Sequence, residues 1–388
     1  NLGRANDGSY YETQNYAITE SHEPGSTFKL VDLIAVLDDK KADTSTVYNS
    51  NGGEVQYYGR RVRDSHKGGY GKISLARGFE VSSNTVLVQS VYNSYKDNPK
   101  QFVDRINSYG LNKPLGLPIK GEGKPVIPQP GTNRWSGVAL PWMAFGYGLS
   151  VTPLQTLTLY NAVANDGVMV KPIFVSEIKE WNKTIKKFNT EVINPKICSQ
   201  ETLDKVQAVL ENVVKKGTGS KLYSKDFSMA GKTGTAQVNY KDKSKLYYAS
   251  SFVGYFPADE PKYSCIIVVH KPNVAAGYYG ADVAGPVFKR IAQKIFTDSP
   301  SMNHVKNIDA KVVSQEKSYA EYYKKVEKES NVVPNVKGME GMDAVALLEN
   351  LGLKVKVIGI GRVKKQSLTS GQTFNKNQTI IIELSWSN

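Results

Sequence analysis

The chain has 388 residues and a formal net charge of +14, from 50 Lys and Arg against 36 Asp and Glu. Its 40% hydrophobic and 22% charged residues are typical of a folded protein and exclude general disorder, and the length predicts two or three domains. No run reaches the roughly 18 apolar residues of a membrane span, and no basic run matches a nucleic-acid-binding module, so nucleic acid is not an expected partner.

The first strong element is a buried helix. Residues 28–37, FKLVDLIAVL, are apolar nearly all round, which predicts a helix inside a large domain, entered sharply at Pro24-Gly25. Residues 39–72 are polar and Gly-rich, which favours loops and short hairpins. Residues 152–155 form a capping box with proline at the first helical position, and residues 201–216 read as another helix.

Three strand-like runs follow, at residues 229–238, 247–256 and 263–270. The short link Pro257–Pro261 between the last two predicts an antiparallel hairpin. Residues 281–296 carry apolar side chains at helical spacing and would pack on the sheet. We therefore expect an α/β or α+β fold, with an antiparallel sheet flanked by helices.

The composition changes after this point. Residues 298–331 are polar and charged, which predicts a linker between a first domain (1–297) and a small α/β module (332–388). In the module we expect a helix at 343–351 and strands at 355–358 and 379–384. Its minor core is predicted to contain the module's regularly spaced apolar residues: Val336, Val345, Leu347, Leu348, Leu351, Val355, Val357 and Ile381.

The first chemical motif is Ser26-Thr27-Phe28-Lys29 at the start of the buried helix. A spacing of three places Ser26 and Lys29 on one helical face. A serine hydroxyl needs a base to act as a nucleophile, and a lysine serves only if burial or neighbouring cations lower its pKa. By itself the SxxK pattern is common, and an incidental Ser and Lys would be the simpler explanation.

The second motif is Ser82-Ser83-Asn84, in which a hydroxyl could relay protons and a carboxamide could bind a substrate amide. The third is Lys232-Thr233-Gly234-Thr235 within a predicted strand. Its cation and hydroxyls suit a carboxylate, and its glycine permits close backbone approach. SxxK, SxN and KTG in this order are the signature of β-lactamases and penicillin-binding proteins, and their joint occurrence by chance is improbable.

The wider context of the motifs resembles one group in particular, the transpeptidase domain of class B penicillin-binding proteins of the cell-division type. The segments that carry the resemblance are EPGSTFK at 23–29, GYGLSVTPLQ at 146–155 and SFVGYFP at 251–257. The resemblance covers about residues 1–297 and implies the penicillin-binding-protein/β-lactamase-like transpeptidase fold.

The C-terminal module resembles a PASTA module. The resemblance rests on Val333-Pro334-Asn335-Val336, on a helix ending at Leu351-Gly352-Leu353, and on Gly371 before the last strand. The chain departs from that family at Leu368, where proline is frequent.

The class B resemblance implies the following acylation chemistry. Ser26 would attack the carbonyl of the penultimate D-Ala of a peptidoglycan stem peptide and release the terminal D-Ala, with Lys29 as its general base. Ser82 would pass a proton to the leaving group, and Asn84 would hold the acyl-side amide. A neighbouring stem peptide would then accept the acyl group.

It also implies the substrate-binding residues. Lys232 and Thr233 would support catalysis and bind the substrate carboxylate with help from Thr235, beside Gly234. The backbone N–H groups of Ser26 and Thr235 would form the oxyanion hole. β-Lactam antibiotics would acylate Ser26, and neither a metal nor a cofactor is expected.

The resemblance further implies a location and partners. The enzyme would be anchored in the bacterial cytoplasmic membrane with an extracytoplasmic catalytic domain, the anchor lying outside this chain. Its partners would be division-complex membrane proteins, including a glycan polymerase.

Several rival functions have weaker support in the sequence. A P-loop needs glycine where Asp226 stands, and no G-x-S-x-G supports a triad hydrolase. His22 has no motif context and precedes the Pro24-Gly25 turn, so it is interpreted as structural. The E-x-x-L-N element of class A β-lactamases is missing. Cys198 and Cys265 belong to no metal or redox motif, although a disulfide between them stays open. A DD-carboxypeptidase and a non-catalytic β-lactam sensor remain as alternatives.

Overall fold

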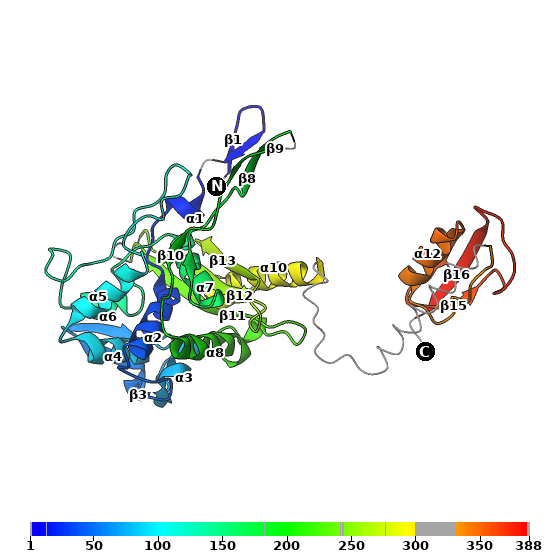
Figure 1. The fold of residues 1–388 in the computed structure, drawn as a ribbon. Helices are drawn as coiled ribbons and strands as arrows, with labels where there is room; N and C mark the ends of the chain where they lie inside the picture. The colour runs from blue at the N-terminus through cyan, green and yellow to red at the C-terminus, as the bar shows by residue number, and fades with distance from the viewer. Residues whose placement is uncertain are drawn as a thin grey trace. The chain divides into compact units, whose positions relative to one another are not determined.

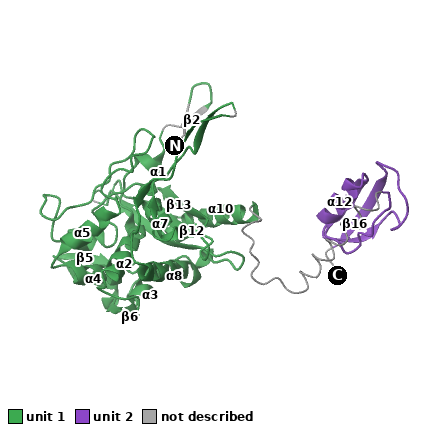
Figure 2. Ribbon diagram, in the orientation of Figure 1, with its two compact units in different colours: residues 1–302 green, residues 303–388 purple. Residues whose placement is uncertain are grey.

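The computed structural model describes residues 2–12, 14–181, 183–240, 242, 244–275, 277–298 and 331–385. It divides into two compact units, residues 1–302 and 303–388 (Figure 2). Of the polar linker predicted at 298–331, residues 299–330 lie outside the described residues, and Asp298 is the last residue of a helix.

The first unit contains a three-stranded antiparallel sheet in the order β11-β12-β13 (Figure 1). Its strands, β11 (Ala230–Val238), β12 (Tyr247–Phe256) and β13 (Tyr263–His270), confirm the three predicted runs. Alternate side chains of β12 point to opposite faces of the sheet and lie in different hydrophobic cores. Val253 and Tyr255 belong to the main core, whereas Phe252 and Phe256 pack with Phe288 of α10 (Gly285–Asp298).

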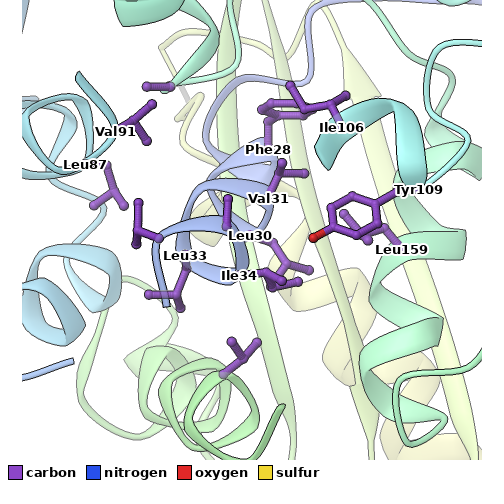
Figure 3. Packing of buried hydrophobic residues seen from close by; sticks show 14 of the residues in the cluster. Phe28, Leu30, Val31, Leu33, Ile34, Leu87, Val91, Ile106, Tyr109 and Leu159 are labelled. Atoms are coloured by element: carbon purple, nitrogen blue, oxygen red, sulfur yellow. The ribbon is translucent and has the colours of Figure 1, made fainter. Parts of the chain in front are cut away.

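The main core surrounds the predicted apolar helix, which is α2 (Lys29–Asp38) and has every residue from Lys29 to Leu37 buried. Side chains of three other helices point toward it (Figure 3): α4 (Asn84–Tyr95), α5 (Pro99–Ser108) and α7 (Pro153–Ala164). Helix α8 (Gln200–Lys216) packs against both α2 and β11. An all-round apolar sequence is what this position demands, because α2 meets protein on every side.

The helix predictions are confirmed except for two details. A 3-10 turn, η1 (Gly25–Phe28), precedes α2, so Ser26 lies before the α-helix and not in its first turn. The helix predicted at 281–296 is divided into α9 (Gly280–Val283) and α10. The capping box exists as predicted, since Gln155 N donates to Thr152 Oγ1 and Thr152 N donates to the Gln155 side chain.

The remaining elements of the first unit are short, and those between residues 39 and 74 confirm the predicted loops and hairpins. They are β1 (Leu2–Arg4), β2 (Tyr10–Glu12), α1 (Tyr16–Thr19), β3 (Val47–Asn49), η2 (Asn51–Gly53), β4 (Glu54–Tyr57), β5 (Arg60–Arg63), β6 (Lys72–Ser74), α3 (Leu75–Glu80), α6 (Ala139–Met143), β7 (Met169–Val170), β8 (Glu177–Glu180), β9 (Lys183–Lys187), β10 (Val192–Asn194) and η3 (Ser220–Leu222). Two-stranded pairings join β1 to β2, β3 to β6, β4 to β5, β7 to β10 and β8 to β9.

The second unit has one helix and a three-stranded sheet in the order β14-β16-β15 among its described residues. Helix α12 (Gly341–Asn350) and strands β14 (Lys354–Ile358) and β16 (Thr379–Ser385) confirm the prediction. Strand β15 (Arg362–Gln366) was not predicted, because RVKKQ offers only one apolar side chain, Val363, to reveal a buried face.

Part of the predicted core of this unit was wrong. Ile380 and Ile382 are buried, so Ile381 between them faces away from the core, and Val357 is 44% exposed. In a strand, choosing the wrong residue of an apolar run places the whole set on the opposite face. The other six predicted residues do belong to this core or pack against it.

Candidate active site

The three motifs come from separate parts of the chain and meet around one cleft of about 760 Å³. Ser26 of η1, Ser82 and Asn84 before and at the start of α4, and Thr233 and Thr235 of β11 line the cleft. Lys29 and Lys232 are fully buried and do not line it. The two lysines therefore lie behind the cleft wall, while the hydroxyls and the carboxamide face the space where a substrate fits.

Lys29 connects the first motif to the second. Its Nζ donates hydrogen bonds to Ser82 O at 2.8 Å, to Ser82 Oγ at 3.2 Å and to Asn84 Oδ1 at 2.6 Å. An ammonium has three N–H donors, so these contacts use all of them. In the described part of the chain the Ser26 hydroxyl makes no hydrogen bond of its own. A neutral amine has two N–H groups and a lone pair, so loss of one proton gives Lys29 the ability to accept a proton.

Burial changes the protonation of both lysines. Desolvation lowers the pKa of Lys29 to about 7, although the carboxylates of Asp64 and Asp32 act in the opposite direction. Desolvation, reinforced by the charge of Lys29, also holds the pKa of Lys232 well below its usual value. Lys232 Nζ lies 5.6 Å from the centre of the Phe79 ring and donates to Thr233 O at 3.2 Å. Lys29 is thus available as a neutral amine near pH 7.

Two glycines shape the turn that carries Ser26. Gly25 has φ +58°, and its N–H donates to Gly146 O at 3.1 Å. Gly146 itself has φ +80°, and a Cβ there would lie 2.0 Å from Gly25 O. Only glycine permits both the positive φ and this approach. The segment 146–155, which carries part of the family resemblance, therefore packs directly against the turn that carries Ser26.

The third motif presents hydroxyls along the edge of β11. Thr233 Oγ1 lies 2.7 Å from Thr218 Oγ1, and Thr235 Oγ1 accepts from Gly280 N at 3.0 Å. A Cβ on Gly234 would meet Ser251 Oγ at 2.3 Å and Thr27 Cγ2 at 2.9 Å. The space that Gly234 leaves is thus occupied by the protein itself, which brings η1 close to the strand.

The second motif sits in a strained turn. Ser82 has φ +59°, a conformation that is uncommon for a residue with a Cβ. Ser83 is the N-cap of α4, its side chain accepting from Val86 N. Asn84 Nδ2 donates to Arg63 O at 2.7 Å, which leaves Asn84 Oδ1 to face Lys29.

Sequence reasoning missed three polar residues at this site. Asp64 lines the cleft and accepts hydrogen bonds from the segment after Ser82, and Thr218 pairs with Thr233. Asp32 is fully buried on α2, and burial raises its pKa well above the usual value. Only Asp32 left a signal in the sequence, as the one charged residue between Leu30 and Leu37 of the apolar helix.

Other reactive residues lie elsewhere. His22 does not line the cleft, and burial, together with the nearby His270, lowers its pKa to about 4, so its ring is neutral at pH 7. Cys198 and Cys265 are free thiols, so the disulfide left open above is not formed. No group of three or more His, Cys, Asp or Glu suited to a metal ion occurs among the described residues.

Comparison with protein families gives two matches. Residues 3–293 match the penicillin binding protein transpeptidase domain, and residues 331–385 match the PASTA domain. Among individual relatives, the chain is 29% identical over 385 residues to stage V sporulation protein D of Bacillus subtilis, covering 97% of this chain and 56% of that protein. It is 29% identical over 280 residues to peptidoglycan D,D-transpeptidase FtsI of Escherichia coli, covering 72% of this chain and 44% of that protein.

A solved structure with a similar fold is penicillin binding protein 3 of Mycobacterium tuberculosis. It has a TM-score of 0.66 at 27% identity, covering 74% of this chain and 66% of that one. The same protein has been solved in complex with aztreonam, with a TM-score of 0.65 at 27% identity and 74% and 65% coverage. The chain spans about half the length of the relatives it matches. No helix in the described ranges is long and apolar enough to cross a membrane.

Proposed function

Because the chain belongs to the penicillin-binding protein transpeptidase family, we propose that it is a serine DD-transpeptidase that cross-links peptidoglycan stem peptides and is acylated by β-lactams. The observation that carries this proposal is the buried Lys29 amine, hydrogen-bonded to Ser82 and Asn84 directly behind a cleft that Ser26 lines. A nucleophile, a base near its working pKa and a proton relay are thus assembled in one place.

In the acylation step, the neutral Lys29 amine takes the Ser26 proton as Ser26 Oγ attacks the carbonyl carbon of the penultimate D-Ala. A tetrahedral oxyanion forms, and the backbone N–H groups of Ser26 and Thr235 donate to it. The C–N bond to the terminal D-Ala then breaks. Its amine leaves with a proton passed from Lys29 through the Ser82 hydroxyl, which lies 3.2 Å from Lys29 Nζ.

The threonines of β11 hold the substrate in place. Thr233 and Thr235 direct hydroxyls into the cleft, where they donate to the carboxylate of the terminal D-Ala, and Thr218 orients the Thr233 hydroxyl. Lys232 supports catalysis from its buried position behind the cleft wall, and Gly234 permits the close approach of η1 to β11. Asn84 holds the amide on the acyl side.

In the second half-reaction, the amine of a neighbouring stem peptide enters the place vacated by D-Ala. It attacks the ester carbonyl while Ser82 and Lys29 receive its proton, and the C–O bond to Ser26 breaks as the hydroxyl recovers a proton. The product is a cross-link between two stems, and the enzyme returns to its starting protonation state.

The wider role is proposed on the names of the relatives. We propose a catalytic domain at about 1–297 and a PASTA module at about 332–388, joined by a linker, in a protein that acts on the extracytoplasmic side of the bacterial cytoplasmic membrane. Relatives named for D,D-transpeptidation and for sporulation support a role in septal wall synthesis, with membrane proteins of the division complex as partners.

The proposal is tested with a stem pentapeptide as donor and a second stem peptide as amine acceptor, followed by mass spectrometry. We expect a cross-linked product, release of one D-Ala per turnover, and a benzylpenicillin adduct on Ser26. In Ser26→Ala the adduct and the product should both disappear while the melting temperature is kept. Hydrolysed donor without cross-link would identify a carboxypeptidase, and an adduct without any turnover of peptide would identify a sensor.

A further inference from the structure

Asp64 directly follows β5 and joins the β4–β5 hairpin to the start of α4. Its Oδ1 accepts from Thr85 N at 2.9 Å, and its Oδ2 accepts from Thr85 Oγ1 at 2.9 Å. Both carboxylate oxygens also lie 3.1 Å from Ser83 Oγ, which donates to them. A carboxylate is well placed here, because the first N–H groups of a helix lack intrahelical acceptors and favour negative charge.

The hydrogen bonds of Asp64 fall on either side of Asn84. The preceding residue, Arg63, accepts from Asn84 Nδ2 through its backbone oxygen at 2.7 Å. An amide has one donor end and one acceptor end, so this contact fixes which way the carboxamide points. Asn84 Oδ1 must then face Lys29 Nζ, at 2.6 Å. The hairpin end at 63–64 therefore sets the orientation of the whole second motif.

The strained backbone of Ser82 needs contacts on both sides of its turn to hold it, and Asp64 supplies those on one side. A residue with a Cβ at φ +59° costs on the order of 1–3 kcal/mol and persists only where surrounding contacts hold it. Backbone bonds from Ser82 N to Phe79 O and from Ser83 N to Gly78 O hold the turn from the side of α3. Asp64 holds it from the side of the cleft. Between these two attachments, Ser82 keeps both its oxygens on Lys29.

Asp64 also matters through its charge. Two acidic side chains raise the pKa of Lys29, Asp64 from the hairpin and Asp32 from its own helix, while the charge of Lys29 in turn acts on Lys232 of β11. Asp32 is fully buried with no hydrogen-bond partner for either oxygen in the described structure, which favours its neutral form. Lys232 is buried too, and the same burial favours the neutral amine. Asp64 is therefore the neighbour whose negative charge opposes the desolvation of Lys29.

We propose that Asp64 is a positioning residue: it holds Ser82 and Asn84 on the Lys29 amine, and its negative charge sets the pH range in which that amine can act as a base. This proposal rests on the transpeptidase chemistry proposed above. The residue takes no part in the proposed bond-making and proton-transfer steps, and acts through Lys29, Ser82 and Asn84.

The test compares Asp64→Asn and Asp64→Ala with the wild type, using the full chain. The change to asparagine keeps the volume and one acceptor oxygen but removes the charge, whereas the change to alanine removes every contact. Glu54→Gln is the matched control, because it also removes one negative charge from the same hairpin. With that charge the ion pairs of Glu54 with Arg61 and Arg63 are lost. The second-order rate constant for acylation by a fluorescent penicillin is measured from pH 5 to 9, with thermal melting at each pH.

Without the Asp64 charge the amine is more readily neutral, so the acid limb of the Asp64→Asn profile should move to lower pH by about one unit, the ordinary effect of one close charge. Asp64→Ala should show the same movement and a plateau lower by at least about tenfold, since Ser82 and Asn84 lose their support. Glu54→Gln should follow the wild type.

The outcomes separate this proposal from the function on which it rests. A wild-type chain that is not acylated at Ser26 removes the proposed function itself. The role of Asp64 is overturned if the wild type is acylated and a folded Asp64→Asn variant keeps the acid limb of its pH–rate profile at the wild-type position. This holds even if the plateau of the acylation rate constant falls. A lower plateau alone is what a merely structural side chain would give. Should Asp64→Ala fail to fold, Asp64→Asn still decides the matter.

Discussion

The pH dependence of acylation is the most direct consequence of the buried Lys29. An ordinary lysine with a pKa of 10.5 is neutral in only about 3 molecules in 10⁴ at pH 7, whereas a pKa of about 7 makes about half of the molecules neutral. The burial of one amine therefore raises the concentration of the active base about 10³-fold at pH 7. Below pH 7 the advantage over an ordinary lysine is kept, but the neutral fraction itself falls about tenfold for each pH unit.

The sign of the effect follows from the role of the base. Below pH 7 the amine is protonated, so the rate constant for acylation of Ser26 by benzylpenicillin should rise about tenfold per pH unit and level off above about pH 7. The assay is intact-mass detection of the adduct at short reaction times between pH 5 and 9, with thermal melting at each pH to exclude unfolding.

Two results would refute this reasoning. A rate constant that does not change between pH 5 and 9 would mean that Lys29 is not the titrating base. A rate constant that still rises about tenfold per unit up to pH 9 would mean that burial does not lower its pKa. Lys29→Arg provides an independent check. Arginine keeps the positive charge but does not deprotonate at working pH, so acylation should fall by at least about 10²-fold with no acid limb near pH 7.

Four further predictions concern the frame around the site. Gly146→Ala places a Cβ 2.0 Å from Gly25 O, so it should lower the free energy of unfolding in urea by more than about 2 kcal/mol and should slow acylation. In the control Gly131→Ala the glycine also has a positive φ but nothing lies within 4 Å of the added Cβ, so the loss should be only about 1 kcal/mol. Equal losses of stability in the two variants would contradict the steric argument. Because the pKa of Asp32 is raised in the folded state, the wild type loses stability as the pH rises above about 4, by up to about 1.4 kcal/mol per pH unit. The stability of Asp32→Asn relative to the wild type should therefore be higher at pH 8 than at pH 5. A difference in stability that does not depend on pH would argue against a neutral carboxyl. A chain ending at Asp298 should melt cooperatively and still bind penicillin; failure to fold would show that the units depend on each other. The penicilloyl adduct should persist for minutes to hours after free drug is removed, since no motif supplies a water-activating carboxylate, and turnover on the order of 1 s⁻¹ would indicate a hydrolase.

The sequence determined the elements whose local pattern is unambiguous. The all-round apolar run from Phe28 to Leu37 predicts a helix that only the centre of a domain accepts, and the three strand runs and the capping box at 152–155 follow from short-range rules of periodicity and hydrogen bonding. The same local reading predicts Ser26 as the nucleophile and Lys29 as its base, because SxxK, SxN and KTG carry their meaning in residue type and spacing. It was less secure in the small module, where the apolar run of β16 did not reveal that Ile380 and Ile382, and not Ile381, face the core.

The tertiary structure alone decided how these residues act on one another. The contacts of Lys29 with Ser82 and Asn84 span more than 50 residues of sequence, and no periodicity encodes them. The lowered pKa of Lys29 arises from desolvation by every element packed around α2, a property of the whole fold rather than of the motif. Asp64 belongs to no motif, and it matters because the hairpin end brings its carboxylate to the start of α4. Local sequence specifies which chemical groups are present, whereas burial and long-range contact determine their protonation and orientation.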